Sequence, residues 1–206
     1  MKVFVSILIG YLYGSIPIGY LLGKIKGVDI TKEGFKKIGT SNVYKVLGLP
    51  YAVLTFIFDF TKGIIVVLIS QTLLSIHKEI VFLSGLAAIL GHNFPIWLKF
   101  RGQGRGVAAS LGLSAYLLPS LTIKAFAFYV IITLTLKSTA PATPVFFILL
   151  PILGWATKQP PWALHFTLSL LAVFIITRLI GGFNYIRQST NKLKALWDIY
   201  VWDKIE

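Results

Sequence analysis

The chain has 206 residues, of which 56% are hydrophobic and only 13% are charged, and its mean hydropathy is +0.79. A soluble domain of this size cannot bury so much apolar surface, because small proteins have a high ratio of surface to core volume. The sequence therefore predicts an all-α integral membrane protein forming a single domain, 1–206. The chain contains no cysteine, which excludes disulfides, thiolate metal sites and a cysteine nucleophile.

The formal net charge is +13, from 20 Lys and Arg against 7 Asp and Glu. The basic residues cluster between apolar segments, which is typical of the cytoplasmic loops of membrane proteins. This placement favours anionic lipid headgroups or phosphorylated substrates as partners, rather than nucleic acid. The chain enters an apolar stretch directly at its N-terminus, so we interpret that stretch as a retained first span.

Apolar runs separated by charged or proline-containing segments predict about seven transmembrane helices in chain order, of which the fourth and the sixth are short. The runs cover residues 3–22, 51–74, 80–98, about 107–118, 121–136, 145–156 and 162–176. The fourth and fifth runs meet at Pro119 and leave an alternative open, in which they form one long helix and the total is six.

The distribution of charge predicts the orientation of these spans, with the N-terminus outside and the C-terminus in the cytoplasm. Fifteen of the 20 Lys and Arg residues then lie in cytoplasmic segments, four lie outside and Lys62 lies within a span, as the positive-inside rule requires. The tail, 183–206, carries Trp197, Tyr200 and Trp202 among charged residues. It is predicted to be an interfacial amphipathic segment on the cytoplasmic side.

The first candidate site is the basic loop that runs from Lys26 to Lys45. Gly39 is followed by side chains with hydroxyl or amide donors, including Ser41 and Asn42, and Lys45 adds a cation. Such donors beside a flexible glycine suit an oxyanion ligand. The alternative is an ordinary solvated cytoplasmic loop, which is the more frequent origin of this composition.

The second candidate is the pair Asp59 and Lys62 inside the second span. Positions i and i+3 share a helix face, so the two charges can neutralise each other. Charged residues within a span are costly and usually face a cavity or the bundle interior. The pair is therefore either part of a functional site or a purely structural contact that fixes helix packing.

The third candidate begins with Gly91-His92-Asn93-Phe94-Pro95 and continues from Lys99 to Gly106. In its glycine-rich stretch Gly102, Gly104 and Gly106 alternate with Gln103 and Arg105, and Lys99, Arg101 and Arg105 add positive charge. Glycines let backbone N–H groups approach a ligand closely, and the start of the next helix favours an anion. We interpret this stretch as a phosphate cradle, against the alternative of a flexible basic hinge. It is neither a Walker A loop nor a dinucleotide fingerprint.

Nucleophiles and metal sites are not evident from the order of the residues. His92 is a candidate base, although a lone histidine near the end of a span is more often a hydrogen-bonded structural residue. His77 and His165 have no companions at metal-ligand spacing, so no metal site is predicted.

Several motifs resemble the PlsY family, the bacterial membrane enzymes that acylate glycerol 3-phosphate with acyl phosphate. The resemblance covers most of the chain and is carried by Gly14-Ser15-Ile16-Pro17, Lys26-Gly27-Val28-Asp29, Gly39-Thr40-Ser41-Asn42-Val43, Asp59-Phe60-Thr61-Lys62-Gly63, Gly91-His92-Asn93-Phe94-Pro95 and Gly102-Gln103-Gly104-Arg105-Gly106-Val107-Ala108. It implies a seven-span protein of the bacterial cytoplasmic membrane, with its site on the cytoplasmic face.

The resemblance also implies the reaction: the sn-1 hydroxyl of glycerol 3-phosphate attacks the acyl carbon of acyl phosphate, giving lysophosphatidic acid and phosphate. No cofactor is needed, because the acyl group is already activated and the protein supplies positioning and charge. On this basis Arg105, Lys45 and His92 are predicted to be catalytic. The predicted substrate phosphate-binding residues are Gly39, Ser41, Asn42, Arg101, Gly102, Gly104 and Gly106.

The chain departs from the family pattern in each motif. Gly34-Phe35-Lys36-Lys37 replaces Gly-Ser-Gly-Asn, Lys45 replaces an arginine, and Gly102-Gln103-Gly104-Arg105-Gly106 replaces Gly-Gly-Lys-Gly. In the third motif Ala140 stands at a serine position, and residues 177–182 contain neither the family's histidine nor its asparagine. The residues that could replace these groups are Ser138, Thr139, Thr143 and Asn184.

These departures leave two other functions open. One is a catalytically silent relative that binds a phosphorylated lipid or intermediate, for which the missing third-motif groups are the reason. The other is a small transporter or channel that uses Asp59 and Lys62, although no internal repeat supports it.

Overall fold

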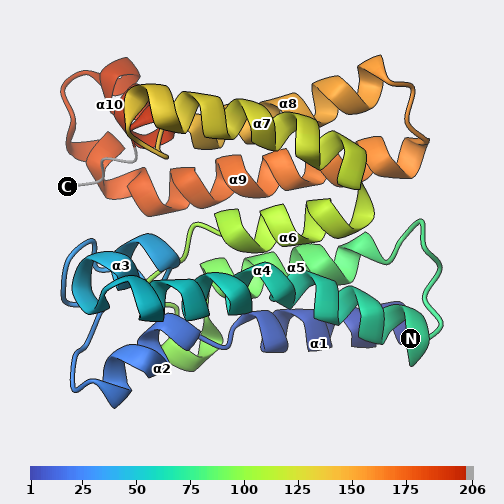
Figure 1. Ribbon diagram of the computed structural model, residues 1–206, viewed down its shortest axis with the longest axis horizontal. Coiled ribbons are helices and arrows are strands. Elements are labelled where there is room, and N and C mark those ends of the chain that lie inside the picture. The colour runs from blue at the N-terminus through green and yellow to red at the C-terminus, as the bar shows by residue number, and fades with distance from the viewer. Residues whose placement is uncertain (203–206) are drawn as a thin grey trace. The chain divides into compact units, whose positions relative to one another are not determined.

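A computed structural model describes residues 1–202, and within that range the chain forms helices and loops without any β-strand (Figure 1). The chain divides into two compact units, Met1–Leu117 and Leu118–Glu206, called here the N-terminal and C-terminal units. The N-terminal unit contains α1 (Lys2–Gly14), α2 (Ile18–Ile25), α3 (Thr40–Leu47), α4 (Leu49–Thr72), α5 (Phe82–Asn93), the 3-10 helix η1 (Ile96–Leu98) and α6 (Val107–Leu117). The C-terminal unit contains α7 (Pro119–Leu136), α8 (Ala142–Ala156), α9 (Pro161–Gln188) and α10 (Lys192–Val201).

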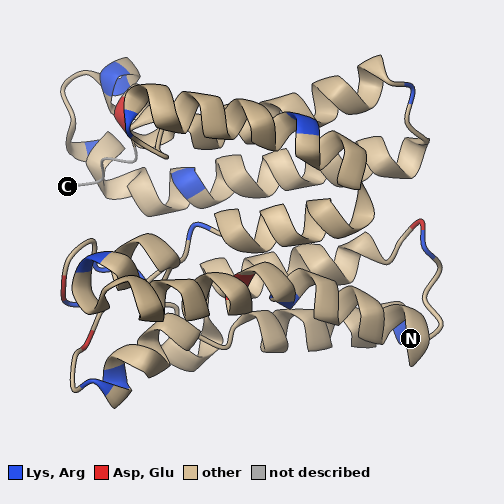
Figure 2. Ribbon diagram, viewed as in Figure 1, with Lys and Arg blue, Asp and Glu red and all other residues tan. Residues whose placement is uncertain are grey.

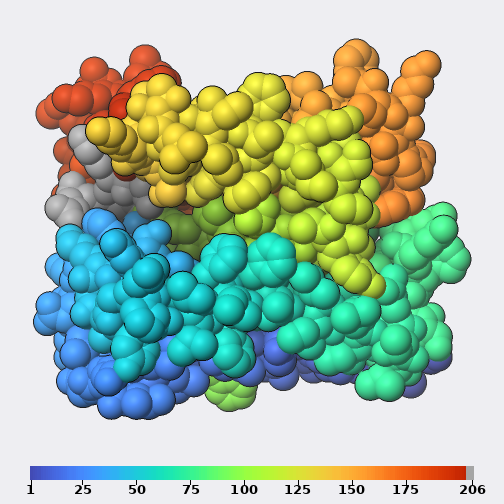
Figure 3. All heavy atoms as spheres, in the orientation of Figure 1, coloured from blue at the N-terminus to red at the C-terminus, as the bar shows by residue number. Residues whose placement is uncertain are grey.

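In the N-terminal unit α4 packs against α1, α5 and α6, while the short helices α2 and α3 lie at one end with their loops (Figure 1). The side chains of α3 and α4 make up much of the face of this unit that is visible in Figure 3. The opposite end carries the N-terminus and the loop between α4 and α5 (Figure 1). The loop between α2 and α3 and the glycine-rich loop before α6 therefore lie at the same end of this unit (Figure 1).

Glycines set the distance between the helices of the N-terminal unit. A Cβ added at Gly14 would lie 2.1 Å from the carbonyl oxygen of Ala88, and one at Gly112 would lie 1.8 Å from the carbonyl oxygen of Phe60. Small residues at helix interfaces let backbones approach closely, which replaces the hydrophobic driving force that is weak between helices in lipid. These glycines thus hold α1 against α5 and α6 against α4.

Aromatic rings pack the C-terminal unit. The rings of Phe147 and Phe174 stack with their centroids 4.5 Å apart, and neighbouring rings continue the series on both sides. The short helix α10 packs on α9, where Gly182 makes room for Ile199 and the Arg178 guanidinium donates to the Ile199 carbonyl oxygen at 3.0 Å.

Four helical segments are long and apolar enough to cross a membrane, namely Lys2–Ile25, Leu49–Thr72, Pro119–Leu136 and Pro161–Gln188. The other three apolar segments, Phe82–Leu98, Val107–Leu117 and Ala142–Ala156, are shorter. The alternative of one long helix across the fourth and fifth runs is wrong, because Leu118 leaves helical geometry (φ −138°, ψ 62°) before α7 begins at Pro119. The first run is also interrupted, between α1 and α2 at 15–17.

The tail predicted to lie at the interface, 183–206, is helical over most of its described part. Residues 183–188 continue α9, and α10 forms most of the remainder. Lys192 stabilises the turn between the two helices, since its Nζ donates to the carbonyl oxygens of Ile186, Arg187 and Ser189 at 2.7–2.9 Å. The end of the predicted tail, 203–206, lies outside the described residues.

Candidate active site

The basic loop between α2 and α3 is folded around the buried side chain of Asn42. Its Oδ1 accepts from the Phe35 N–H at 2.6 Å, and its Nδ2 donates to the carbonyl oxygens of Ile30, Glu33 and Lys37 at 2.7–3.2 Å. A buried amide whose donors and acceptor are all used on one loop fixes that loop in a single conformation. Asn42 therefore shapes the site, and its contribution as a direct phosphate ligand stays a prediction.

The glycine-rich loop rests directly on this basic loop. The Ile38 N–H donates to the Gly102 carbonyl oxygen at 3.2 Å, and a Cβ on Gly102 would lie within 3 Å of the side chains of Thr31 and Ile38. Gly102 and Gly106 have φ of +66° and +67°, a conformation that glycine adopts without strain. The structure thus brings together two motifs that are about 60 residues apart in sequence, as their shared chemistry would require.

The start of α3, at Gly39, has open space beside it. Gly39 caps the helix without a side-chain cap, and a Cβ there would meet nothing within 4 Å. The Thr40 hydroxyl oxygen is buried and has no hydrogen-bond partner within residues 1–202, while Ser41 is exposed. Free N–H groups at a helix start favour an anion. An oxyanion near Gly39 would give these donors a partner.

A buried polar network of three side chains, Asp59, Lys62 and His92, lies next to the glycine-rich loop. Asp59 Oδ1 is 2.9 Å from Lys62 Nζ and 3.2 Å from His92 Nδ1, and these residues are only 2–4% exposed. Lys62 Nζ also donates to the Ile16 carbonyl oxygen at 2.7 Å, at the interruption between α1 and α2. The network therefore ties together α4, α5 and the break in the first span.

The end of α5 supports the glycine-rich loop from this side. A Cβ on Gly104 would lie 2.3 Å from His92 Nε2, and one on Gly106 would lie 2.6 Å from Asn93 Oδ1. Any side chain at these two positions would displace the loop from α5. The glycines are thus needed for close packing as well as for exposing backbone N–H groups.

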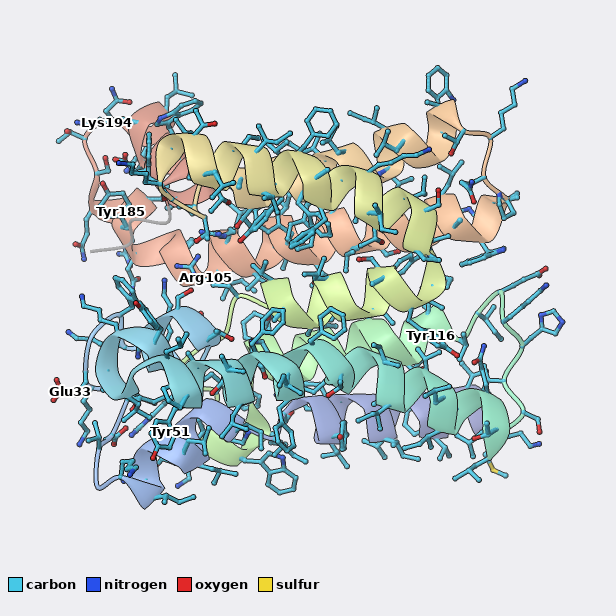
Figure 4. All side chains as sticks on the ribbon, viewed as in Figure 1. Glu33, Tyr51, Arg105, Tyr116, Tyr185 and Lys194 are labelled. Carbon is cyan, nitrogen blue, oxygen red and sulfur yellow. The ribbon has the colours of Figure 1, made fainter. Side chains whose placement is uncertain are left out.

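Cations surround the two loops. In the N-terminal unit the Lys and Arg residues gather at the end that carries α2 and α3 (Figure 2). Arg105 lies in the loop that leads into α6, on the same end as Glu33 and Tyr51, whereas Tyr116 lies towards the opposite end (Figure 4). Lys45 is exposed, with its Nζ 4.3 Å from the centre of the Phe35 ring. This end of the unit is suited to anionic ligands.

A hydrogen-bonded turn stabilises the basic loop beside Gly102. Asp29 Oδ1 accepts from the Thr31 hydroxyl at 2.6 Å and from its N–H at 3.1 Å. The hydroxyl hydrogen bond, more than the nearby Lys24 and Lys32, holds the pKa of the Asp29 carboxyl below its ordinary value. The turn therefore keeps its charged acceptor throughout the neutral range.

The contacts of Thr31 and Ile38 with Gly102 could not be predicted from the sequence, because an apolar contact between two loops follows no periodicity.

The third-motif candidates belong to the C-terminal unit. Ser138 Oγ accepts from the Ala140 N–H at 3.3 Å, and the Thr143 hydroxyl donates to the Thr139 carbonyl oxygen at 2.8 Å within its own chain segment. Asn184 is exposed on α9. Their part in the site stays a prediction. Within residues 1–202 no group of three or more His, Asp or Glu has an arrangement that could hold a metal ion.

Known proteins are similar to this chain in sequence and in fold. Residues 4–189 match the family described as Glycerol-3-phosphate acyltransferase. A glycerol-3-phosphate acyltransferase of Fusobacterium nucleatum is 37% identical over 180 residues, which covers 86% of this chain and 91% of the relative.

Two crystal structures of PlsY, an integral membrane glycerol 3-phosphate acyltransferase, are also similar. The glycerol 3-phosphate form has a TM-score of 0.78 at 29% identity, and the lysophosphatidic acid form has 0.76 at 30%. Each alignment covers 96% of this chain and 100% of the solved one. With the match over residues 4–189 and the long apolar helices, these findings show that the chain is an integral membrane protein belonging to the glycerol-3-phosphate acyltransferase family.

Proposed function

We propose that this protein transfers an acyl group from acyl phosphate to the sn-1 hydroxyl of glycerol 3-phosphate, giving lysophosphatidic acid for phospholipid synthesis. The hydroxyl oxygen forms a bond to the acyl carbon, the bond from that carbon to the phosphate oxygen breaks, and the hydroxyl proton leaves with the released phosphate. The observation that carries the proposal is the contact between the basic loop and the glycine-rich loop. The glycerol 3-phosphate and lysophosphatidic acid forms of the similar structures support the acceptor and the product.

Both substrates are anions, so the chief demands on the protein are charge neutralisation and positioning. We assign the first demand to Arg105 and Lys45, as catalytic cations, with Arg101 at the start of the glycine-rich stretch as a further cation. The substrate phosphate would lie against backbone and hydroxyl donors of the two loops. These are Gly39, Ser41, Gly102, Gly104 and Gly106, while Asn42 supports them through the loop that it shapes.

The decisive experiment is an assay of the purified protein with acyl phosphate and labelled glycerol 3-phosphate, in several lipids and with several acyl lengths. We expect lysophosphatidic acid and an equal amount of phosphate. Acyl-CoA and acyl carrier protein serve as alternative donors and identify the acyl source. Absence of product above a control without enzyme, with every donor, would overturn the proposal.

A catalytically silent relative is the second candidate, and the reason is specific: the third-motif positions 140 and 177–182 lack the family's serine, histidine and asparagine. Such a protein would bind glycerol 3-phosphate or lysophosphatidic acid without turnover. Calorimetric titration with both compounds, run on the preparation used for the assay, separates the two candidates. Binding without product would favour the silent relative.

We further propose seven spans in the bacterial cytoplasmic membrane, with the N-terminus outside, the basic end of the N-terminal unit in the cytoplasm and α10 at the interface. The support is the positive-inside distribution of charge together with the exposed Leu193, Trp197 and Trp202.

The natural absence of cysteine permits a direct test of this orientation. Cysteines introduced singly at Lys36 and Ser75 are labelled with a membrane-impermeant maleimide in intact cells. Only the second should react, and labelling at position 36 would reverse the orientation.

A further inference from the structure

The buried network of Asp59, Lys62 and His92 has a geometry that decides which edge of the His92 ring is available. Asp59 Oδ1 lies 3.2 Å from His92 Nδ1, so Nδ1 carries a hydrogen that it donates to the carboxylate. Lys62 Nζ is 2.9 Å from the same oxygen and 3.5 Å from Nδ1. Because these contacts come from α4, the ring of His92 on α5 is held in one orientation.

The other edge of the ring lies against the glycine-rich loop. A Cβ on Gly104 would be 2.3 Å from His92 Nε2 and 2.8 Å from the His92 carbonyl oxygen, so backbone and imidazole are already in contact. A general base needs its free nitrogen within hydrogen-bond reach of the substrate proton. Here that nitrogen abuts the backbone of the loop.

The neighbouring residue makes a second support. Asn93 lies close to Gly106, where an added Cβ would be 2.6 Å from Asn93 Oδ1. His92 and Asn93 therefore contact the loop on either side of Arg105 in sequence. The two residues that flank Arg105 are thus both packed against the end of α5.

We propose that His92 is a positioning residue: Asp59 and Lys62 fix its ring, and the ring fixes the backbone at Gly104 and so places Arg105 for substrate phosphate. This assigns a purpose to a buried ion pair that would otherwise be a costly structural contact. The placement of the loop stands on geometry alone, whereas its effect on turnover rests on the proposed function.

The first test measures the loop without any substrate. Hydrogen exchange of the peptide that covers residues 99–107 is compared in the wild type, His92→Ala and His92→Gln. The glutamine amide is long enough to reach the position of Nε2 beside Gly104, but it cannot act as a base at neutral pH. We expect about tenfold faster exchange in His92→Ala, because the local opening free energy falls when the support is lost, and slower exchange in His92→Gln than in His92→Ala.

The matched control is Ser84→Ala, which removes a buried hydrogen bond that stays at the start of α5, from Ser84 Oγ to the Val81 carbonyl oxygen. Its exchange at 99–107 should equal that of the wild type. Equal exchange in the wild type and His92→Ala would overturn the proposal. Wild-type exchange at 99–107 in Asp59→Ala would overturn the part assigned to Asp59.

The second test separates positioning from base catalysis. We expect His92→Gln to keep kcat within about tenfold and to leave the shape of the pH–rate profile unchanged, while His92→Ala mainly raises KM for glycerol 3-phosphate. A base would instead lose roughly 10²–10⁴ in kcat in both variants and one limb of the profile, which would overturn the proposal. If the wild type itself shows no turnover, the proposed function fails, and the exchange experiment still decides the positioning.

Discussion

The two units of the chain achieve close packing by different means. In the N-terminal unit, backbone meets backbone at glycines: added Cβ atoms at Gly10, Gly14 and Gly112 would lie within 2.3 Å of carbonyl oxygens. In the C-terminal unit, side chains meet side chains in a continuous series of rings. The series runs through Phe126, Tyr129, Phe146, Phe147, Phe174 and Tyr200.

This difference explains where a preformed site can lie. Backbone contacts at glycines cannot adjust without moving a whole helix, so they hold buried polar groups at fixed distances. Asp59, Lys62 and His92 all lie in the unit that is packed this way. Aromatic packing tolerates more variation, and the C-terminal unit is also where the chain departs most from the PlsY pattern. We therefore expect the functional residues to be concentrated in the N-terminal unit.

The largest expected effect is on activity, from Arg105→Ala. Loss of one preformed cation beside the developing charge should lower kcat/KM by about 10²–10³-fold. Arg105→Lys should retain more activity, because charge is preserved while the planar donor geometry is lost. The matched control in the other unit is Arg187→Ala, an exposed arginine on α9. A loss of less than fivefold in Arg105→Ala would contradict the assignment of the site.

The second prediction tests the packing itself by pairing Gly112→Ala with Gly154→Ala. The first Cβ would lie 1.8 Å from the Phe60 carbonyl oxygen, whereas the second would lie 3.2 Å from the end of the Leu164 side chain, which can move. We expect Gly112→Ala to destabilise by roughly 2–3 kcal/mol and Gly154→Ala by less than about 1 kcal/mol. Thermal melting in detergent should show a drop of roughly 4–12 °C for the first. Equal drops would remove the distinction between the units.

Most of the helices could be predicted, because a run of about 20 apolar residues has few alternatives to a membrane helix. The pair Asp59 and Lys62 could be placed on one helix face, and the structure has this ion pair at 2.9 Å. Its third member, His92, could not be joined to it, since periodicity along one helix does not reveal which other helix it packs against. Asn42 shows a similar limit: its donors face inward to the loop backbone, and composition does not show which way an amide points.

The third prediction concerns α10, which begins after the last residue matched to the family, Ser189. Truncation after Gln188 removes the Ile199 carbonyl oxygen that accepts from Arg178. Loss of a partner for a buried donor costs about 1–3 kcal/mol, so the melting temperature should fall. Arg178→Met in the truncated chain should restore part of the loss, because a methionine side chain does not need the hydrogen-bond acceptor that Ile199 supplied. Turnover per folded molecule should stay near that of the full chain. An unchanged melting temperature after truncation would show that α10 does not stabilise the C-terminal unit.

The smallest expected effect is at Phe35 and Lys45, two departures from the PlsY pattern that contact each other at 4.3 Å. The ring attracts the ammonium and restricts where it lies, an interaction of about 0.5–1 kcal/mol at an exposed site. Phe35→Ala should therefore raise KM for glycerol 3-phosphate by roughly two- to fivefold without changing kcat. In a double-mutant cycle with Lys45→Ala, the two effects should be less than additive, because removal of Lys45 already removes the interaction. Strictly additive effects would show that the ring does not act through Lys45, and the cationic end of the N-terminal unit would then bind phosphate without this pair.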